Sequence, residues 1–190
     1  MLDEFSELLA LCQKIFGEVK SELKRKKESS QIAEKKWFEE NQSLVHGIAW
    51  LATYVESLNQ LIKWAKNLHG KKKLFEFESL ALEVAFAEYL QQISHGIPMS
   101  QTEFIRLQHF GDNCKYISSL LSHPKYVSIT NQNYLNNKKK SLVQLALEKD
   151  TSVLFEQTGL DHEYQLIRDQ FNKYNNNRVK NAANSWHKED

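Results

Sequence analysis

The chain has 190 residues, of which 41% are hydrophobic and 26% are charged, and its formal net charge at pH 7 is +1. Six glycines and two prolines exclude collagen-like and proline-rich disordered chains, and so little turn material disfavours an all-β fold. The near-zero net charge removes the main electrostatic argument for a nucleic-acid partner.

Nothing in the sequence predicts secretion or membrane insertion. Residues 1–5 are acidic rather than basic, and no apolar run approaches the roughly 18 residues that a membrane span needs. The two cysteines, Cys12 and Cys114, are too few for a secreted disulfide framework, and free thiols are favoured over a bridge between them. We therefore predict a cytoplasmic protein with no membrane partner.

The first segment predicts one amphipathic helix. Its apolar residues recur at spacings of three and four, which places them on one face: Phe5, Leu8, Leu9, Cys12, Ile15, Phe16, Val19 and Leu23. The basic run 24–27 closes this helix, where the helix dipole favours cations. Ser29 and Ser30 then offer hydroxyls to cap the next helix.

The next predicted helix is long, from about Gln31 to Leu68, and is apolar on two sides. One stripe consists of Leu44, Ile48, Leu51, Val55, Leu58 and Ile62, and the other of Trp50, Tyr54, Leu61, Trp64 and Leu68. A helix of this kind is usually central in a bundle or shared with a partner chain. Gly70 ends it.

A third helix is predicted from about Phe75 to Ser94, and the sequence 96–98 (Gly-Ile-Pro) breaks it. Ser100 and Glu103 then match a capping box, which predicts a short helix that stops near Gly111. The apolar members of that helix are Phe104, Leu107 and Phe110.

Beyond residue 111 the periodicity weakens. Short helices are predicted at 116–121 and 134–147, with Pro124 and a polar stretch between them. A last amphipathic helix begins near Asp161 and presents Tyr164, Ile167, Phe171 and Tyr174, followed by the asparagine triplet 175–177.

The predicted fold is therefore all-α, an antiparallel helical bundle with a C-terminal amphipathic helix. We expect the bundle in residues 1–150, a linker in 151–159, and the last helix in 160–190. That last helix has an apolar face without an obvious companion.

Candidate metal or nucleic-acid sites are weak. The basic runs 24–27, 71–73 and 138–140 are not interleaved with the aromatic residues that single-strand binding uses. The histidines lack the spacing of zinc or di-iron sites, so surface or hydrogen-bonded roles are favoured: His46, His69, His95, His109, His123, His162 and His187. We expect no metal and no nucleic acid.

Candidate catalytic residues are equally weak. Neither cysteine has a nearby base and orienting group, and the phosphate-binding and hydrolase motifs are absent. The paired carboxylates are set in ordinary amphipathic contexts: Glu39 with Glu40, and Glu76 with Glu78. The residues therefore predict no catalytic, cofactor-binding or metal-binding site.

Two stretches nevertheless resemble a known family. The sequences 46–58, 85–90 and 96–101 resemble the helical extension that precedes the dehydrogenase body in (2S)-methylsuccinyl-CoA dehydrogenases, a group within the acyl-CoA dehydrogenase family. Residues 160–171, with Arg178-Val179 and 185–187, are similar to the opening helix of an acyl-CoA dehydrogenase N-terminal domain. The most specific parts are 53–56 (Thr-Tyr-Val-Glu) and 96–101 (Gly-Ile-Pro-Met-Ser-Gln).

This resemblance implies an FAD enzyme in which a glutamate removes the α-proton of an acyl-CoA and the flavin accepts the hydride. No position of this chain matches the FAD-binding segments or that glutamate. We therefore expect a truncated N-terminal part of such a flavoprotein, inactive by itself.

Two alternatives remain open. The chain can be one half of a split flavoenzyme whose missing domains are its partner. It can also be a free-standing helical module for interaction or self-association, which the twice-apolar second helix favours.

Overall fold

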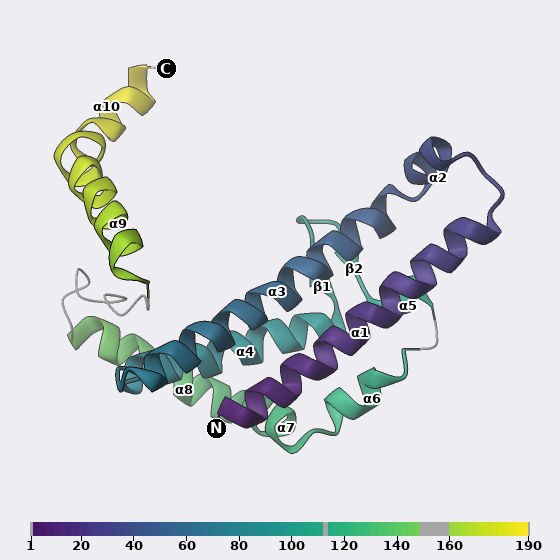
Figure 1. Ribbon diagram of the computed structural model, residues 1–190, viewed down its shortest axis with the longest axis horizontal. Coiled ribbons are helices and arrows are strands. Elements are labelled where there is room, and N and C mark those ends of the chain that lie inside the picture. The colour runs from purple at the N-terminus through teal and green to yellow at the C-terminus, as the bar shows by residue number, and fades with distance from the viewer. Residues whose placement is uncertain (1, 112–113, 149–159, 190) are drawn as a thin grey trace. The chain divides into compact units, whose positions relative to one another are not determined.

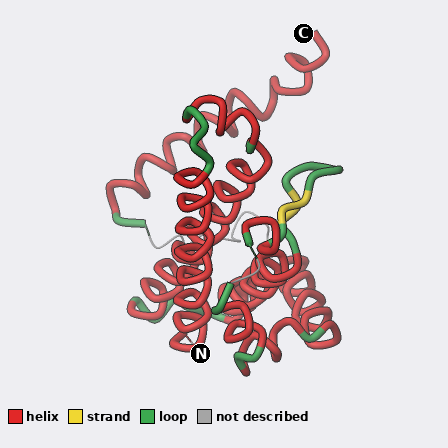
Figure 2. Tube along the Cα trace, turned by 90° about the vertical axis from the view of Figure 1, so that its right-hand side faces the viewer, coloured by secondary structure: helices red, strands yellow, loops and turns green. Residues whose placement is uncertain are grey.

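The computed structural model describes residues 2–111, 114–148 and 160–189. Helices account for most of these residues, and the strands β1 (Ile97–Pro98) and β2 (Phe104–Ile105) form a short antiparallel pair. Figure 2 shows how small this sheet is beside the helices. The predicted all-α class is confirmed. The chain divides into two compact units, Met1–Gln157 and Thr158–Asp190.

Three long helices build the first unit. α1 (Leu2–Ser29) and α3 (Gln42–Gly70) lie side by side in opposite directions, and α4 (Glu76–His95) runs back along α3 (Figure 1). α3 contacts both of the other two helices, as its two apolar stripes predict. The predicted antiparallel bundle is confirmed.

The core lies where these helices meet. Phe5 of α1 and Phe86 of α4 are fully buried, with ring centroids 4.7 Å apart, and Leu51 and Leu58 of α3 are fully buried as well. Each such side chain contributes about 1.5–3 kcal/mol relative to exposure in water. The apolar spacing seen in the sequence therefore selects the core correctly.

Three shorter helices cover the bundle: α6 (Tyr116–Leu121), α7 (Pro124–Thr130) and α8 (Gln132–Glu148). α6 packs on α1, while α7 and α8 pack on α4. The helices predicted at 116–121 and 134–147 are confirmed. α7 was not predicted, although proline is favoured at a first helical position and the His123 ring accepts a hydrogen bond from the Lys125 N–H at 3.2 Å.

The prediction of one helix from Gln31 to Leu68 is wrong. α2 (Glu34–Glu40) is separate from α3, and Gln31 has a φ of +53°. At the break, the Asn41 side-chain amide donates to the Trp37 carbonyl at 2.9 Å, a local bond of the kind that competes with helix continuation. The expected serine cap is also absent, because α2 is preceded by Ala33 and has no side-chain cap.

The capping box predicted at Ser100 and Glu103 is wrong too. The Glu103 carbonyl accepts hydrogen bonds from Met99 N–H at 2.8 Å and Ser100 N–H at 3.3 Å, which closes a hairpin between β1 and β2. The helix α5 (Leu107–Phe110) is limited to the end of the predicted segment. The register of the hairpin buries Ile105 and leaves Phe104 exposed.

The second unit is one uninterrupted helical run. α9 (His162–Tyr174) continues through a π-turn, η1 (Asn175–Val179), into α10 (Lys180–Glu189). The helical run therefore continues through the asparagine triplet 175–177. The linker predicted at 151–159 lies outside the described residues.

Candidate functional site

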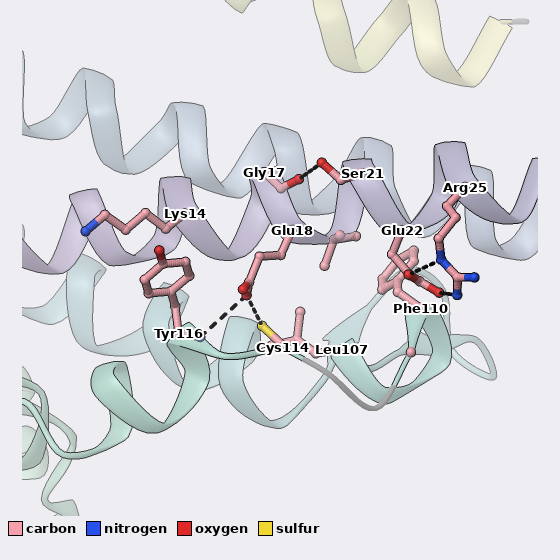
Figure 3. Close-up of a pocket in the computed structure, with 12 residues that line it drawn as sticks. Lys14, Gly17, Glu18, Ser21, Glu22, Arg25, Leu107, Phe110, Cys114 and Tyr116 are labelled. Carbon is pink, nitrogen blue, oxygen red and sulfur yellow. Dashed lines mark hydrogen bonds and ion pairs between the residues drawn. The ribbon is translucent and has the colours of Figure 1, made fainter.

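A cavity of about 570 Å³ lies between α1 and residues from 107–111 and 114–116. Figure 3 shows side chains of α1 facing those of the later segment across this space. Its lining combines apolar and charged residues: Lys14, Gly17, Glu18, Val19, Ser21, Glu22, Arg25, Leu107, Phe110, Gly111, Cys114 and Tyr116. Its size is typical of small-molecule sites.

Glu18 is the polar centre of the cavity. Its Oε2 accepts hydrogen bonds from the Cys114 thiol at 3.3 Å and from the Tyr116 N–H at 3.5 Å (Figure 3). Burial, and then the carboxylate of Glu18, raise the pKa of the Cys114 thiol to about 11. Cys114 is therefore a thiol at neutral pH and a poor nucleophile.

The two cations of the cavity already have partners. Arg25 donates to both carboxylate oxygens of Glu22, at 2.6 and 3.0 Å, and the hydrogen bond from Arg25 lowers the pKa of Glu22. The Lys14 ammonium lies 5.2 Å from the centroid of the Tyr116 ring, which is a cation–π contact.

A second polar cluster joins α4 to α7 and α8. The Glu83 carboxylate is almost buried and accepts from Lys125 at 3.1 Å and Tyr134 at 2.8 Å, with Lys138 at 3.3 Å. Burial opposes ionisation of Glu83, but these donors outweigh it and lower its pKa. The sequence does not indicate this cluster by a motif, although Glu83 falls at apolar spacing between Leu80 and Ala87.

Two of the stretches that carry the family resemblance, 46–58 on α3 and 85–90 on α4, lie side by side. On α3, the indole of Trp50 donates to His46 at 2.9 Å and packs edge-on against Tyr54. Tyr54 donates to Gln92 of α4 at 2.6 Å and packs edge-on against Tyr89, with ring centroids 4.7 Å apart. The resembling segments of α3 and α4 thus form one packed aromatic row.

The hairpin joins the same region. Glu103 accepts a hydrogen bond from Ser43 at 2.9 Å, and its other oxygen lies 3.9 Å from the His46 ring. These contacts hold the hairpin against the beginning of α3. The Ser43 hydroxyl donates to Glu103 and not to the His46 ring, which is not the Ser–His–acid order of a catalytic triad, so these contacts position structure.

The second unit exposes a continuous apolar face. Tyr164, Ile167, Phe171 and Tyr174 recur at spacings of three and four, and their exposed fractions lie between 48% and 72%. The next apolar residue, Val179, comes five positions after Tyr174 instead of three or four. The usual spacing then continues at Ala182 and Trp186. The π-turn, in which the Lys180 N–H bonds to the Asn175 carbonyl, absorbs one extra residue and keeps both halves on one face.

The chain is similar to a known dehydrogenase. The chain is 36% identical over 187 residues to the (2S)-methylsuccinyl-CoA dehydrogenase of Cereibacter sphaeroides. The resemblance predicted from the sequence is confirmed. The match covers 97% of this chain, and the chain spans about a third (33%) of the length of that dehydrogenase. No known family profile matches the chain.

The residues described here do not fit FAD, the cofactor that the acyl-CoA dehydrogenase resemblance implies. A dinucleotide pyrophosphate needs close approach to backbone, which open glycines provide. The described glycines with positive φ are Gly96 and Gly111, and a β-carbon on them would meet the side chains of Arg106 and Glu22, respectively, at 3.3 Å. Both positions are thus covered by side chains. Gly17 and Gly70 are open, but they lie in α1 and α3 with helical backbone, so no residue is assigned to the flavin.

The candidate histidines are dispersed. His46 contacts Trp50, His123 pairs with Glu7 at 3.1 Å, and the His95 ring contacts Ser94 at 2.8 Å. Within residues 2–111, 114–148 and 160–189, no group of three or more His, Cys, Asp or Glu side chains could hold a metal ion. In the same ranges, no helix is long and apolar enough to cross a bilayer.

The basic runs are largely used in ion pairs of the fold. Lys27 pairs with Glu34 at 2.9 Å, Lys24 lies 3.7 Å from Glu28, and Lys139 pairs with Glu88. Cations of the first and third runs thus have carboxylate partners within the fold. Lys71, Lys72 and Lys73 are exposed at the end of α3.

The candidate thiols and carboxylates do not form a common site either. Cys12 and Cys114 are both free, and burial raises the pKa of Cys12 to about 12. Glu40 lies 3.7 Å from Lys36 on the surface of α2. Glu78 differs from its expected amphipathic setting, because it is only 7% exposed and its Oε2 accepts no hydrogen bond from the described residues.

Proposed function

We propose that this chain is a helical structural part of an acyl-CoA dehydrogenase-like protein and is catalytically inactive by itself. The observation that carries the proposal is the match of 97% of the chain to only a third of the dehydrogenase. The fold supports it, because the polar clusters at Glu18, Glu83 and Glu103 join elements of the first unit to one another.

In this proposal, the remaining portion of the dehydrogenase binds to the exposed apolar face of α9 and α10. The matched region spans nearly the whole chain, so the bundle and this face both correspond to parts of the relative. An apolar helix face of this length is unstable in water without a cover. The partner portion would supply both the flavin site and the catalytic base.

The test combines this chain with the part of the Cereibacter sphaeroides dehydrogenase that the match does not cover. The two are co-expressed, and co-purification and flavin absorbance are measured. We expect a complex that retains FAD and reduces an electron acceptor with (2S)-methylsuccinyl-CoA, whereas this chain by itself does neither. FAD binding and acyl-CoA oxidation by this chain by itself would contradict the proposal.

A matched pair of variants tests the docking face. Phe171→Asp places a charge on the apolar face, whereas Leu166→Asp changes a residue outside that face that is also exposed, at 51%. We expect the first variant to abolish co-purification and the second to retain it. Equal behaviour of the two variants would show that this face is not the contact.

Self-association of a free-standing module is the second candidate function. The same exposed apolar face favours it, since two copies could cover each other. Light scattering over a range of concentrations separates the two candidate functions. A dimer that is lost in Phe171→Asp and does not bind the dehydrogenase portion would support the free-standing module. A cytoplasmic location stays a prediction in both cases.

A further inference from the structure

The cavity beside Glu18 has no role in the proposed function. It is enclosed mainly by α1 on one side and by Leu107, Phe110, Cys114 and Tyr116 on the other. We propose that it binds a small amphipathic amine, in which a protonated amino group is attached to an aromatic or aliphatic body.

The walls fit the apolar body of such a ligand. Val19, Leu107 and Phe110 contribute apolar side chains to a space of about 570 Å³. Gly17 widens it, because a β-carbon at this position would meet no atom within 4 Å. A body the size of a bicyclic aromatic ring is well within the range that such cavities accommodate.

The carboxylate of Glu18 fits the amino group. Both hydrogen bonds that the described residues donate to Glu18 go to Oε2, which leaves Oε1 available to a ligand. In Glu22, by contrast, Arg25 engages both oxygens. A charge-assisted bond from an amine to Glu18 would be strong in this partly enclosed place.

The cations of the cavity argue against an acidic ligand. The guanidinium of Arg25 is held by Glu22, and the ammonium of Lys14 lies over the Tyr116 ring. A carboxylate or phosphate would have to displace these contacts and approach Glu18, a like charge. An amine displaces neither contact, and Glu18, whose described donors are the neutral Cys114 thiol and Tyr116 N–H, offers it an opposite charge.

The experiment measures binding of tryptamine to the full chain by amide chemical-shift changes in NMR spectra. Tryptophol, which carries a hydroxyl in place of the amine, is the matched neutral probe. We expect tryptamine to shift the Cys114 and Tyr116 amides saturably, and tryptophol to bind at least about tenfold more weakly, because it lacks the charge-assisted bond.

Two variants localise the site. Glu18→Gln removes the charge but keeps an acceptor for Cys114, and it should weaken tryptamine at least about tenfold. Gly17→Leu fills the open space from an exposed helix position and should abolish binding of both probes. Glu28→Gln, which removes an exposed carboxylate farther along α1, is the control and should bind like the wild type.

Three results would overturn the proposal. One is the absence of saturable tryptamine binding to the wild type. Another is equal affinity for tryptophol, which would make the cavity an apolar groove without preference for amines. The third is unchanged tryptamine binding in Gly17→Leu, checked as folded by its circular dichroism, because the ligand would then lie elsewhere.

Discussion

Ile105 of β2 fills the space beside Gly47 of α3 in which a side chain would otherwise stand. A β-carbon on Gly47 would meet three atoms of the Ile105 side chain, two of them at 2.9 Å, and Ile105 is only 3% exposed. This close packing holds the β1–β2 hairpin against α3. It also brings Glu103 within hydrogen-bond reach of Ser43.

Gly47→Ala should destabilise the bundle by about 1–3 kcal/mol, since Ile105 would have to move out of a packed position. Gly17→Ala is the control on α1, where a β-carbon meets nothing within 4 Å. Alanine is the better helix former by about 1 kcal/mol, so this second change should stabilise the protein slightly. Urea unfolding of both variants measures the effect, and shifts of the same sign would contradict the packing argument.

Glu83→Gln should cost about 3 kcal/mol, because it leaves Lys125 and Lys138 without their carboxylate in a largely buried place. Glu88→Gln is the matched control on the same helix, since its partner Lys139 is more exposed. That change should cost no more than about 1 kcal/mol. Equal losses of unfolding free energy in the two variants would show that Glu83 contributes no more to stability than the exposed Glu88.

The stability due to Glu83 should depend on pH. Its pKa in the folded protein is lowered, mainly by Tyr134 and Lys125 against the opposing effect of burial. The contribution is therefore fully present above the unfolded pKa of about 4.3 and is lost as the pH falls through the folded pKa. Melting temperatures of the wild type and Glu83→Gln should converge as the pH falls from the unfolded pKa through the lowered folded pKa, and a constant gap would contradict this assignment.

The sequence predicts the elements that local periodicity controls. The stripes of α1 and α3 identify Phe5, Leu51 and Leu58 as core, and the structure buries all three. The hairpin could not be found in this way, because the pattern of Ser100 and Glu103 is equally suited to a helix cap. The packing of Ile105 on Gly47 decides between the two, and those residues are distant in sequence.

The candidate site was missed for a related reason. Glu18 and Cys114 are 96 positions apart, and Glu83 and Tyr134 are 51 apart, so no local spacing relates them. Each of these residues is ordinary for an amphipathic helix. Only the packing of α6, α7 and α8 on the long helices brings them together.

Leu51→Asp should destabilise the bundle by about 4 kcal/mol or more, because Leu51 is fully buried and the new carboxylate would have no partner there. Thr53→Asp places the same residue on the exposed side of α3 and should change stability by less than about 1 kcal/mol. Thermal melting followed by circular dichroism measures both variants. A Leu51→Asp protein that melts with the wild type would show that this stripe is not core.

Deletion of residues 151–190 should leave the melting temperature of the bundle within about 2 °C of the full chain, because none of the described residues removed is buried. Deletion of everything after His123 is the contrasting change. It removes Tyr126, Ile129 and Leu135, which are buried in the core, and should lower the melting temperature strongly. A large loss of thermal stability in the shorter deletion would instead make residues 151–190 an integral part of the bundle.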